Sequence, residues 1–166
     1  MMTDKLLEIK KYPDKVLRQN CVRVDKITDE EKTLFENMLF TMRHFCGIGL
    51  AAPQIGISKR LIVASVGDVT LKLANPEIVN TSGSDIMTEG CLSIPNAEVK
   101  VKRPFIATVK GMNEKGKIVE LKTNGLLAKV LQHEIDHLKG RLIIDYMNIL
   151  KRFTFMLTNK RQKING

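Results

Sequence analysis

Apolar residues recur at helical spacing in two stretches of the chain. The first follows Thr28 and Glu31, whose spacing is that of a helix N-terminal capping box. Its apolar residues are Leu34, Phe35, Met38, Leu39, Met42 and Phe45. The pattern predicts an amphipathic helix over residues 29–44 with its apolar face toward a core. The second stretch lies between Asn124 and Gly140 and is apolar on two of three helical faces, which predicts a largely buried helix.

Alternating or continuously apolar runs predict strands elsewhere in the chain. The expected strands are 61–66, 71–80, 99–109, 117–122 and 142–144, with turns at 81–84 and 113–116. A last helix, basic and amphipathic, is expected over about 148–160. Strands in a run, with one buried helix among them, favour an α+β fold with mainly antiparallel pairing.

Length and composition limit the class of protein. A chain of 166 residues is expected to form one domain, 1–166. We expect neither a signal peptide nor a membrane span, because no apolar run approaches the ~20 residues that cross a bilayer. Three cysteines without framework spacing favour a reducing cytosol. The net charge of +9 fits a polyanionic neighbour, such as RNA or an acidic membrane surface, as well as it fits a merely lysine-rich soluble chain.

The predicted buried helix contains the segment QHEIDHLKG at 132–140. His133 and His137 are four residues apart, so a turn of ~100° per residue places them on one face. Two imidazoles so placed can bind one metal ion, with Glu134 beside them to transfer a proton. The alternative is a helix with two incidental histidines, because H-E-x-x-H is a short motif. Two of the three histidines of the chain lie here, which favours the metal.

A tetrahedral metal site needs a third protein ligand and an open position. The candidates are the three cysteines, His44 and the carboxylates. Cys91 is the best of them, because it lies in a kinked segment between Gly90 and Pro95 where a thiolate can face a cleft. The alternative is that Cys91 is a small buried apolar residue. A Cys-His-His site with water in the fourth position favours metal-assisted hydrolysis of an amide, in which Glu134 accepts the proton and later donates it to the amine.

Charge that develops on the substrate oxygen needs hydrogen-bond donors. The glycine-rich stretch 47–56 is either extended backbone that lines a site or an ordinary buried connection, and Gln54 is its one side-chain donor. A backbone N–H near Cys91 is a second candidate donor. On a helical wheel, Leu126 and Val130 continue the face of the two histidines, so a substrate would meet an apolar surface there.

Lys129, Gln132, Asp136 and Lys139 occupy the remaining arc of that wheel. Asp136 is expected either in solvent or beside the metal ligands. In the second case Arg103 is the candidate for its ion-pair partner.

Three segments of the sequence together resemble the signature segments of peptide deformylase. They are GIGLAAPQ at 47–54, EGCLS at 89–93 and QHEIDHL at 132–138, in this order. The resemblance covers roughly residues 5–150. That family removes the formyl group from the N-terminal formyl-methionine of new bacterial and organellar proteins. The resemblance implies an α+β fold with antiparallel sheets wrapped around the H-E-x-x-H helix.

The resemblance also implies roles for individual residues. The metal ligands of the family match Cys91, His133 and His137, and its general base matches Glu134. The groups that stabilise the formyl oxygen match Gln54 and the backbone N–H of Leu92, and a contact to the substrate amide matches the Gly49 backbone. The implied apolar pocket for the methionine side chain would be formed by Leu126, Val130 and the His133 ring, with Ile48 and Met87 as further members.

The implied cofactor is one divalent metal ion, Fe(II) by preference, with Zn or Ni as replacements. The implied substrates are N-formylmethionyl peptides and nascent chains in the bacterial cytoplasm, or in an organelle if a transit segment precedes this sequence. The basic C-terminal helix fits contact with the ribosome, and we expect neither a membrane nor a DNA partner.

Two residues depart from the family pattern. Cys46 replaces an acidic residue common before the first segment, and Glu98 stands where many members have an Arg that holds the peptide backbone. Two rival functions are a zincin-like peptidase and a non-catalytic RNA- or ribosome-binding domain. The cysteine ligand argues against the first, and the complete set of candidate catalytic residues argues against the second.

Overall fold

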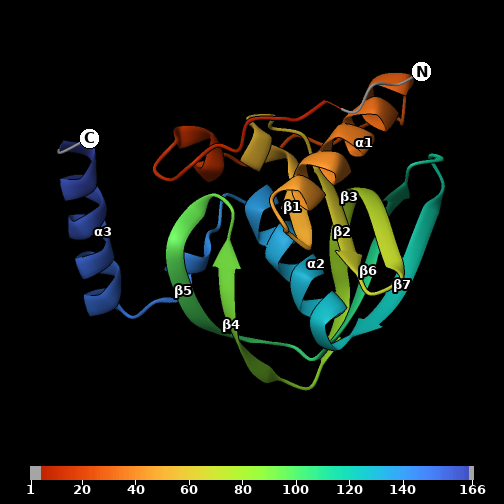
Figure 1. Ribbon diagram of the computed structural model, residues 1–166. Helices are drawn as coiled ribbons and strands as arrows, with labels where there is room; N and C mark the ends of the chain where they lie inside the picture. Colours follow the sequence, from red (N-terminus) through yellow and green to blue (C-terminus); the bar gives the residue numbers. More distant parts are fainter. Residues whose placement is uncertain (1–4, 165–166) are drawn as a thin grey trace.

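The structure, a computed structural model, describes residues 5–164, with the backbone alone for 96 and 159–164 (Figure 1). An antiparallel five-stranded sheet has the strand order β1-β2-β3-β6-β7. Its strands are β1 (Gly49–Ala51), β2 (Leu61–Val66), β3 (Val69–Ser82), β6 (Ile106–Asn113) and β7 (Ile118–Asn124). A separate antiparallel hairpin pairs β4 (Asp85–Cys91) with β5 (Ile94–Arg103).

The described residues also form three α-helices and three short 3₁₀ turns. The helices are α1 (Asp29–His44), α2 (Gly125–Leu138) and α3 (Ile149–Ile164). The turns are η1 (Lys15–Arg18), η2 (Ala52–Ile55) and η3 (Ile143–Tyr146). The predicted mixture of helix and antiparallel sheet, with a C-terminal helix, is confirmed. Within residues 5–164, no helix has both the length and the apolar character to span a membrane.

The helix α1 follows the predicted pattern because its signals are local. The Glu31 carboxylate accepts hydrogen bonds from the backbone N–H and the hydroxyl of Thr28, which anchors the first turn. The apolar face of α1, with Phe35, Met38 and Met42 fully buried, packs with β1 and β2.

The helix α2 lies between the five-stranded sheet and the β4–β5 hairpin (Figure 1). Leu131, Ile135 and Leu138 are buried against the sheet. On the hairpin side, Lys129 and Gln132 are also buried, although the wheel placed them outside the two apolar faces. The Gln132 amide donates hydrogen bonds to the carbonyls of Pro104 and Ala128, at 3.0 and 2.9 Å, which offsets the cost of burying it.

Two predicted strands are wrong. The expected strand 99–109 is two strands, because Pro104, which lacks a backbone N–H, follows the last residue of β5 and the chain turns before β6. The expected strand 142–144 is instead the start of η3. There the Asp145 carboxylate accepts a hydrogen bond from the Leu142 N–H at 2.9 Å, which favours a turn over an extended chain.

The strand β3 is longer than predicted and runs through Asn75 and Pro76. Its register with β6 shifts between Ala74 and Glu77, so a bulge absorbs the proline. Asn75 has a positive φ of 52°, and its side chain bonds both the N–H and the carbonyl of Val24. The irregularity therefore ties the N-terminal segment to the sheet.

Candidate metal centre and active site

Three candidate ligand atoms converge where β4 ends beside α2. The Nε2 atoms of His133 and His137 lie 3.2 Å apart, and the Cys91 Sγ is 3.3 Å from Nε2 of His137. All three ligand atoms lie within 4.8 Å of one another. A tetrahedral ion at ordinary Zn–N and Zn–S bond lengths separates its ligand atoms by about 3.3–3.6 Å. The cluster therefore has nearly the spacing that one metal ion requires.

A buried carboxylate orients the first of these histidines. Glu89 is 5% exposed, and its Oε2 is 2.9 Å from the Nδ1 of His133. A proton on Nδ1 leaves Nε2 with its lone pair directed into the cluster, which is the usual arrangement around a metal-bound histidine. Burial disfavours the charged carboxylate, but hydrogen bonds from His133 and Arg103 outweigh it and hold the pKa of Glu89 at about 2.

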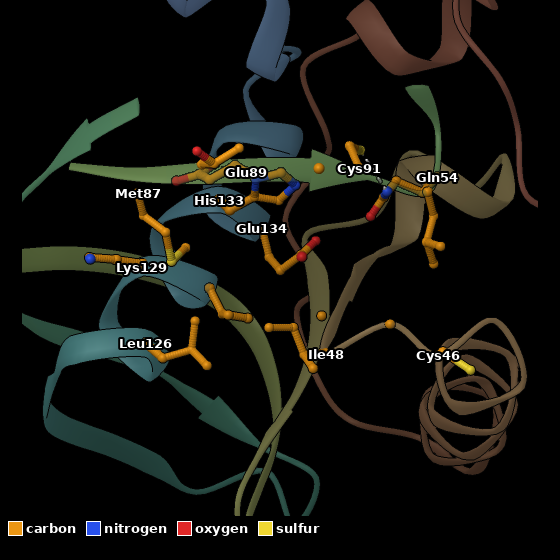
Figure 2. Close-up of a pocket in the computed structure, with 16 residues that line it drawn as sticks. Cys46, Ile48, Gln54, Met87, Glu89, Cys91, Leu126, Lys129, His133 and Glu134 are labelled. Carbon is orange, nitrogen blue, oxygen red and sulfur yellow. Dashed lines mark hydrogen bonds and ion pairs between the residues drawn. The ribbon is translucent and has the colours of Figure 1, made fainter. Parts of the chain in front are cut away.

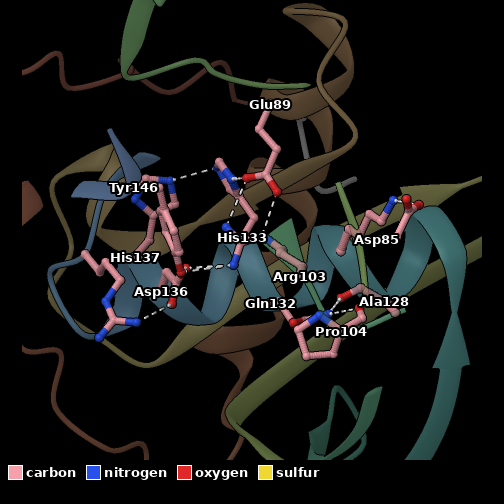
Figure 3. Close-up of polar contacts among 12 residues, drawn as sticks. Asp85, Glu89, Arg103, Pro104, Ala128, Gln132, His133, Asp136, His137 and Tyr146 are labelled. Carbon is pink, nitrogen blue, oxygen red and sulfur yellow. Dashed lines mark hydrogen bonds and ion pairs between the residues drawn. The ribbon is translucent and has the colours of Figure 1, made fainter. Parts of the chain in front are cut away.

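The guanidinium of Arg103 joins the hairpin to α2 (Figure 3). It donates to Glu89 at 2.6 and 3.0 Å and to the Asp136 carboxylate at 2.9 Å, so the predicted Arg103–Asp136 pair forms. The Tyr146 hydroxyl donates to the same Asp136 oxygen at 2.6 Å. Sequence reasoning missed Glu89 and Tyr146. The signal for Glu89 was its position two residues before Cys91 on one strand.

Glu134 lines the pocket and is only 4% exposed. Burial raises the pKa of Glu134 to about 7. Its Oε2 is buried and has no hydrogen-bond partner in the part of the chain that the structure describes. A buried carboxylate oxygen without a partner is costly, so this atom is suited to accept a proton from a bound water or to return it to a substrate.

Gln54 is held with its amide nitrogen toward the cysteine. Its Oε1 accepts a hydrogen bond from the Ala51 N–H at 2.8 Å, so the Nε2 donor faces Cys91 Sγ at 3.5 Å and Ser93 Oγ at 3.3 Å. The neighbouring Leu92 carbonyl accepts a hydrogen bond from Lys11. Gln54 and Lys11 therefore both bond the turn between β4 and β5.

The Gly49 backbone faces the open edge of the five-stranded sheet, because β1 is an edge strand. The Ile48 carbonyl accepts a hydrogen bond from the Ser65 N–H in β2 at 2.9 Å. Successive residues of a strand direct their N–H and C=O groups to opposite sides. The Gly49 groups therefore point away from β2 and are placed to bond an extended peptide.

A pocket of about 550 Å³ opens beside the cluster (Figure 2). The candidate site residues in its wall are Ile48, Gly49, Gln54, Met87, Cys91, Leu92, Leu126, Val130, His133 and Glu134. His137 is 1% exposed and lies behind this wall. Cys46 also lines the pocket, whereas Glu98 is exposed on β5 and does not. Lys129 lines it too, which the sequence did not predict.

Two histidines of a buried helix that meet a strand cysteine, with an unpartnered carboxylate and a pocket beside them, form the arrangement of a metal-assisted hydrolase. The family model for polypeptide deformylase matches residues 6–153. The chain belongs to this family, and it is therefore an enzyme.

Individual peptide deformylases are similar to this protein over nearly its whole length. It is 44% identical over 163 residues to a peptide deformylase of Thermodesulfovibrio yellowstonii, which covers 95% of this chain and 99% of that protein. A peptide deformylase from Legionella pneumophila has a crystal structure that matches with a TM-score of 0.89 and 38% identity, over 98% of this chain and 99% of that one. A peptide deformylase from Synechococcus elongatus, solved in complex with actinonin, matches with a TM-score of 0.86 and 40% identity. The match covers 94% of this chain and 90% of that one.

Proposed function

We propose that this chain removes the formyl group from the N-terminal formyl-methionine of newly synthesised proteins, and that the hydrolysis takes place at Cys91, His133 and His137. The observation on which the proposal depends is the convergence of three ligand atoms beside the buried, unpartnered Glu134 carboxylate. Membership of the deformylase family supplies the substrate class.

The Cys91 thiolate and the two Nε2 atoms would hold one divalent metal ion, and Fe(II) is the ion we propose. Their separations of 3.2 and 3.3 Å fit one ion, and Glu89 supports the His133 ring from behind. A bound divalent ion would act as a Lewis acid on the formyl carbonyl and lower the pKa of a water toward 7.

Glu134 would act as the general base and then as the general acid. Its free Oε2 would accept the proton of the attacking water and return it to the amine that leaves as the C–N bond breaks. Burial favours this exchange, because it brings the pKa of the carboxyl to about 7, near the operating pH.

Two donors would stabilise the negative charge that develops on the formyl oxygen. The Gln54 Nε2 is already directed toward Cys91 by the bond between its Oε1 and Ala51. The Leu92 backbone N–H is the second donor. The outward-facing Gly49 backbone would bond the substrate amide, and the pocket between Ile48, Met87 and Val130 would take the methionine side chain.

Formate release from formyl-Met-Ala-Ser by freshly purified protein tests the proposal. Glu134→Ala should abolish most of the activity, while Glu77→Ala, which removes a half-exposed carboxylate on β3, should leave it unchanged. Formate release that survives Glu134→Ala would overturn the mechanism. Cleavage of unblocked peptides without formate release would favour the rival peptidase.

We propose further that the enzyme acts in the cytoplasm and approaches the ribosome through α3. This helix lies at the outside of the molecule (Figure 1), and Ile149, Leu150 and Phe153 are exposed. Residues 149–164 include five Lys or Arg and no Asp or Glu. Basic residues near RNA give salt-dependent binding. Ribosome association that is absent, or that does not weaken as salt rises, would contradict this part of the proposal.

A further inference from the structure

One wall of the pocket is formed by a buried lysine. Lys129 projects from α2 between Met87 and Leu126 (Figure 2) and is 5% exposed. Ile48 and Val130 make the neighbouring wall apolar. An ammonium group in such surroundings is destabilising unless it is paired.

Asp85, the first residue of β4, provides that pair. The Lys129 Nζ lies 2.5 Å from Asp85 Oδ2, and the side-chain exposures are 6% for the lysine and 49% for the aspartate. The pair therefore lies at the boundary with solvent, and the charged end of the lysine is directed out of the pocket while its methylenes line the wall. The hydrogen bond from Lys129 lowers the pKa of the Asp85 carboxyl, so the partner stays charged.

The pair lies at the end of the pocket farther from the metal cluster. Asp85 and Met87 are two residues apart on β4 and so face the same side of the hairpin. Figure 3 shows Asp85 at the opposite end of α2 from His137. The side chain of the substrate's first residue, entering the pocket past His133, would thus reach the Lys129 methylenes with its far end.

We propose that the Lys129–Asp85 ion pair determines which first residue the enzyme accepts. The inference rests on the proposed deformylase function. With Asp85 in place, the ammonium is paired with a carboxylate outside the pocket lining, and the pocket offers an apolar wall to methionine. Among the described residues, Asp85 is the one acidic side chain that pairs with Lys129, so without it the ammonium becomes available to an acidic side chain of the substrate.

A double-mutant cycle tests the proposal on formyl-Met-Ala-Ser and formyl-Glu-Ala-Ser. For each variant, the ratio of the two kcat/KM values is measured on one preparation, so differences in metal content cancel. Asp85→Asn should raise the ratio of the glutamate to the methionine substrate by about tenfold or more. Lys129→Met should not raise it, and the double variant should behave like Lys129→Met.

Glu36→Gln is the matched control. It also removes the acidic partner of a largely buried lysine, since Glu36 pairs with Lys72 at 2.5 Å with side-chain exposures of 45% and 18%, but away from the pocket. Its ratio should equal that of the wild type. A ratio for Asp85→Asn within about twofold of the wild type overturns the proposal. A raised ratio that persists in the double variant overturns it equally, because Lys129 would not be the cause.

Thermal unfolding gives an independent readout of the pair. Asp85→Asn should lower Tm by several degrees, because it leaves an unpaired buried ammonium, and adding Lys129→Met should restore most of the loss. Wild-type protein that releases no formate from either peptide would contradict the proposed function. Wild-type activity on the methionine peptide with an unmoved ratio would contradict only the role of this pair.

Discussion

Gly49 and Glu134 are in direct contact, and the contact leaves no room for a side chain on the glycine. A Cβ added at Gly49 would collide with Glu134 Oε1 and lie 2.9 Å from its Cδ and 2.8 Å from Val130 Cγ1. The glycine-rich segment and the metal-binding helix, far apart in sequence, therefore meet at the carboxylate proposed as the general base. The φ of Gly49 is not in the positive range, so its backbone conformation does not require glycine. The requirement comes from the close approach of Glu134.

Gly49→Ala should displace the Glu134 carboxylate and lower kcat. A misplacement of about 1 Å in a catalytic group reduces the rate by roughly 100-fold. Formate release gives the rate, and the metal content of the purified variant shows whether the ligands are intact. We expect metal content to be unchanged, since the three atoms nearest an added Cβ belong to Glu134 and Val130 and not to a metal ligand. A variant with wild-type kcat would show that the carboxylate position is not critical.

Arg103→Met should weaken metal binding and destabilise the fold. It leaves the buried Glu89 carboxylate without the guanidinium that compensates its charge, which costs about 3–5 kcal/mol when a buried pair is broken. The loosened His133 ring should cost roughly 10- to 100-fold in metal affinity. Chelator competition and urea unfolding measure the two effects. Glu89→Gln combined with Arg103→Met should recover much of the stability but not the metal affinity, and equal recovery of both would contradict the orienting role of Glu89.

Cys91→Ser should reduce metal content strongly, because a serine hydroxyl replaces the thiolate ligand. The matched control is Cys46→Ser, at an exposed cysteine on the pocket rim, which should keep its metal. Metal analysis of protein prepared without oxygen is the measurement. Unchanged metal content in Cys91→Ser would remove Cys91 from the site.

Glu31 should make stability depend on pH below about 5. Hydrogen bonds from Lys59 and Thr28 lower the pKa of Glu31 from 4.5 to about 2. A pKa that is lower in the folded state stabilises the protein above the unfolded-state value, and the stabilisation disappears as pH falls toward 2. At pH 7 Glu31→Gln should therefore lose about 3 kcal/mol, and the loss should shrink progressively below pH 4.5.

Glu30→Gln provides the comparison for Glu31→Gln in urea unfolding at each pH. Glu30 bonds the same Lys59, but its side chain is 76% exposed, so its removal should cost less than about 0.5 kcal/mol. A pH-independent difference between wild type and Glu31→Gln would show that packing, not charge, accounts for the effect of Glu31.

Features with local causes were predictable from the sequence. The bounds of α1 follow from a capping pair three residues apart and from a 3.6-residue repeat, both of which act within one or two turns. The convergence of His133 and His137 follows in the same way from their spacing on one helix. The Arg103–Asp136 pair was named as one of two alternatives for Asp136 and does form, although no local pattern links the two residues.

Features with distant causes were not predictable. The differences at Pro104 and at 142–144 are not among them, because the proline and the Asp145 carboxylate that cause them are local signals. Lys129 falls outside the apolar faces of the α2 wheel, yet the β4–β5 hairpin covers it. No periodicity in α2 reports on a hairpin some forty residues earlier.

The sequence alone determined the chemistry: two histidines one turn apart, a carboxylate between them, a cysteine in a kinked segment and a glycine-rich stretch with one amide donor. These depend on residue type and short spacing. Only the tertiary structure decided the arrangement: that Glu89 supports His133, that Gly49 lies against Glu134, and that Asp85 draws the charge of Lys129 out of the pocket. Each of these contacts joins segments at least 40 residues apart, and their geometry depends on how two sheets enclose one helix.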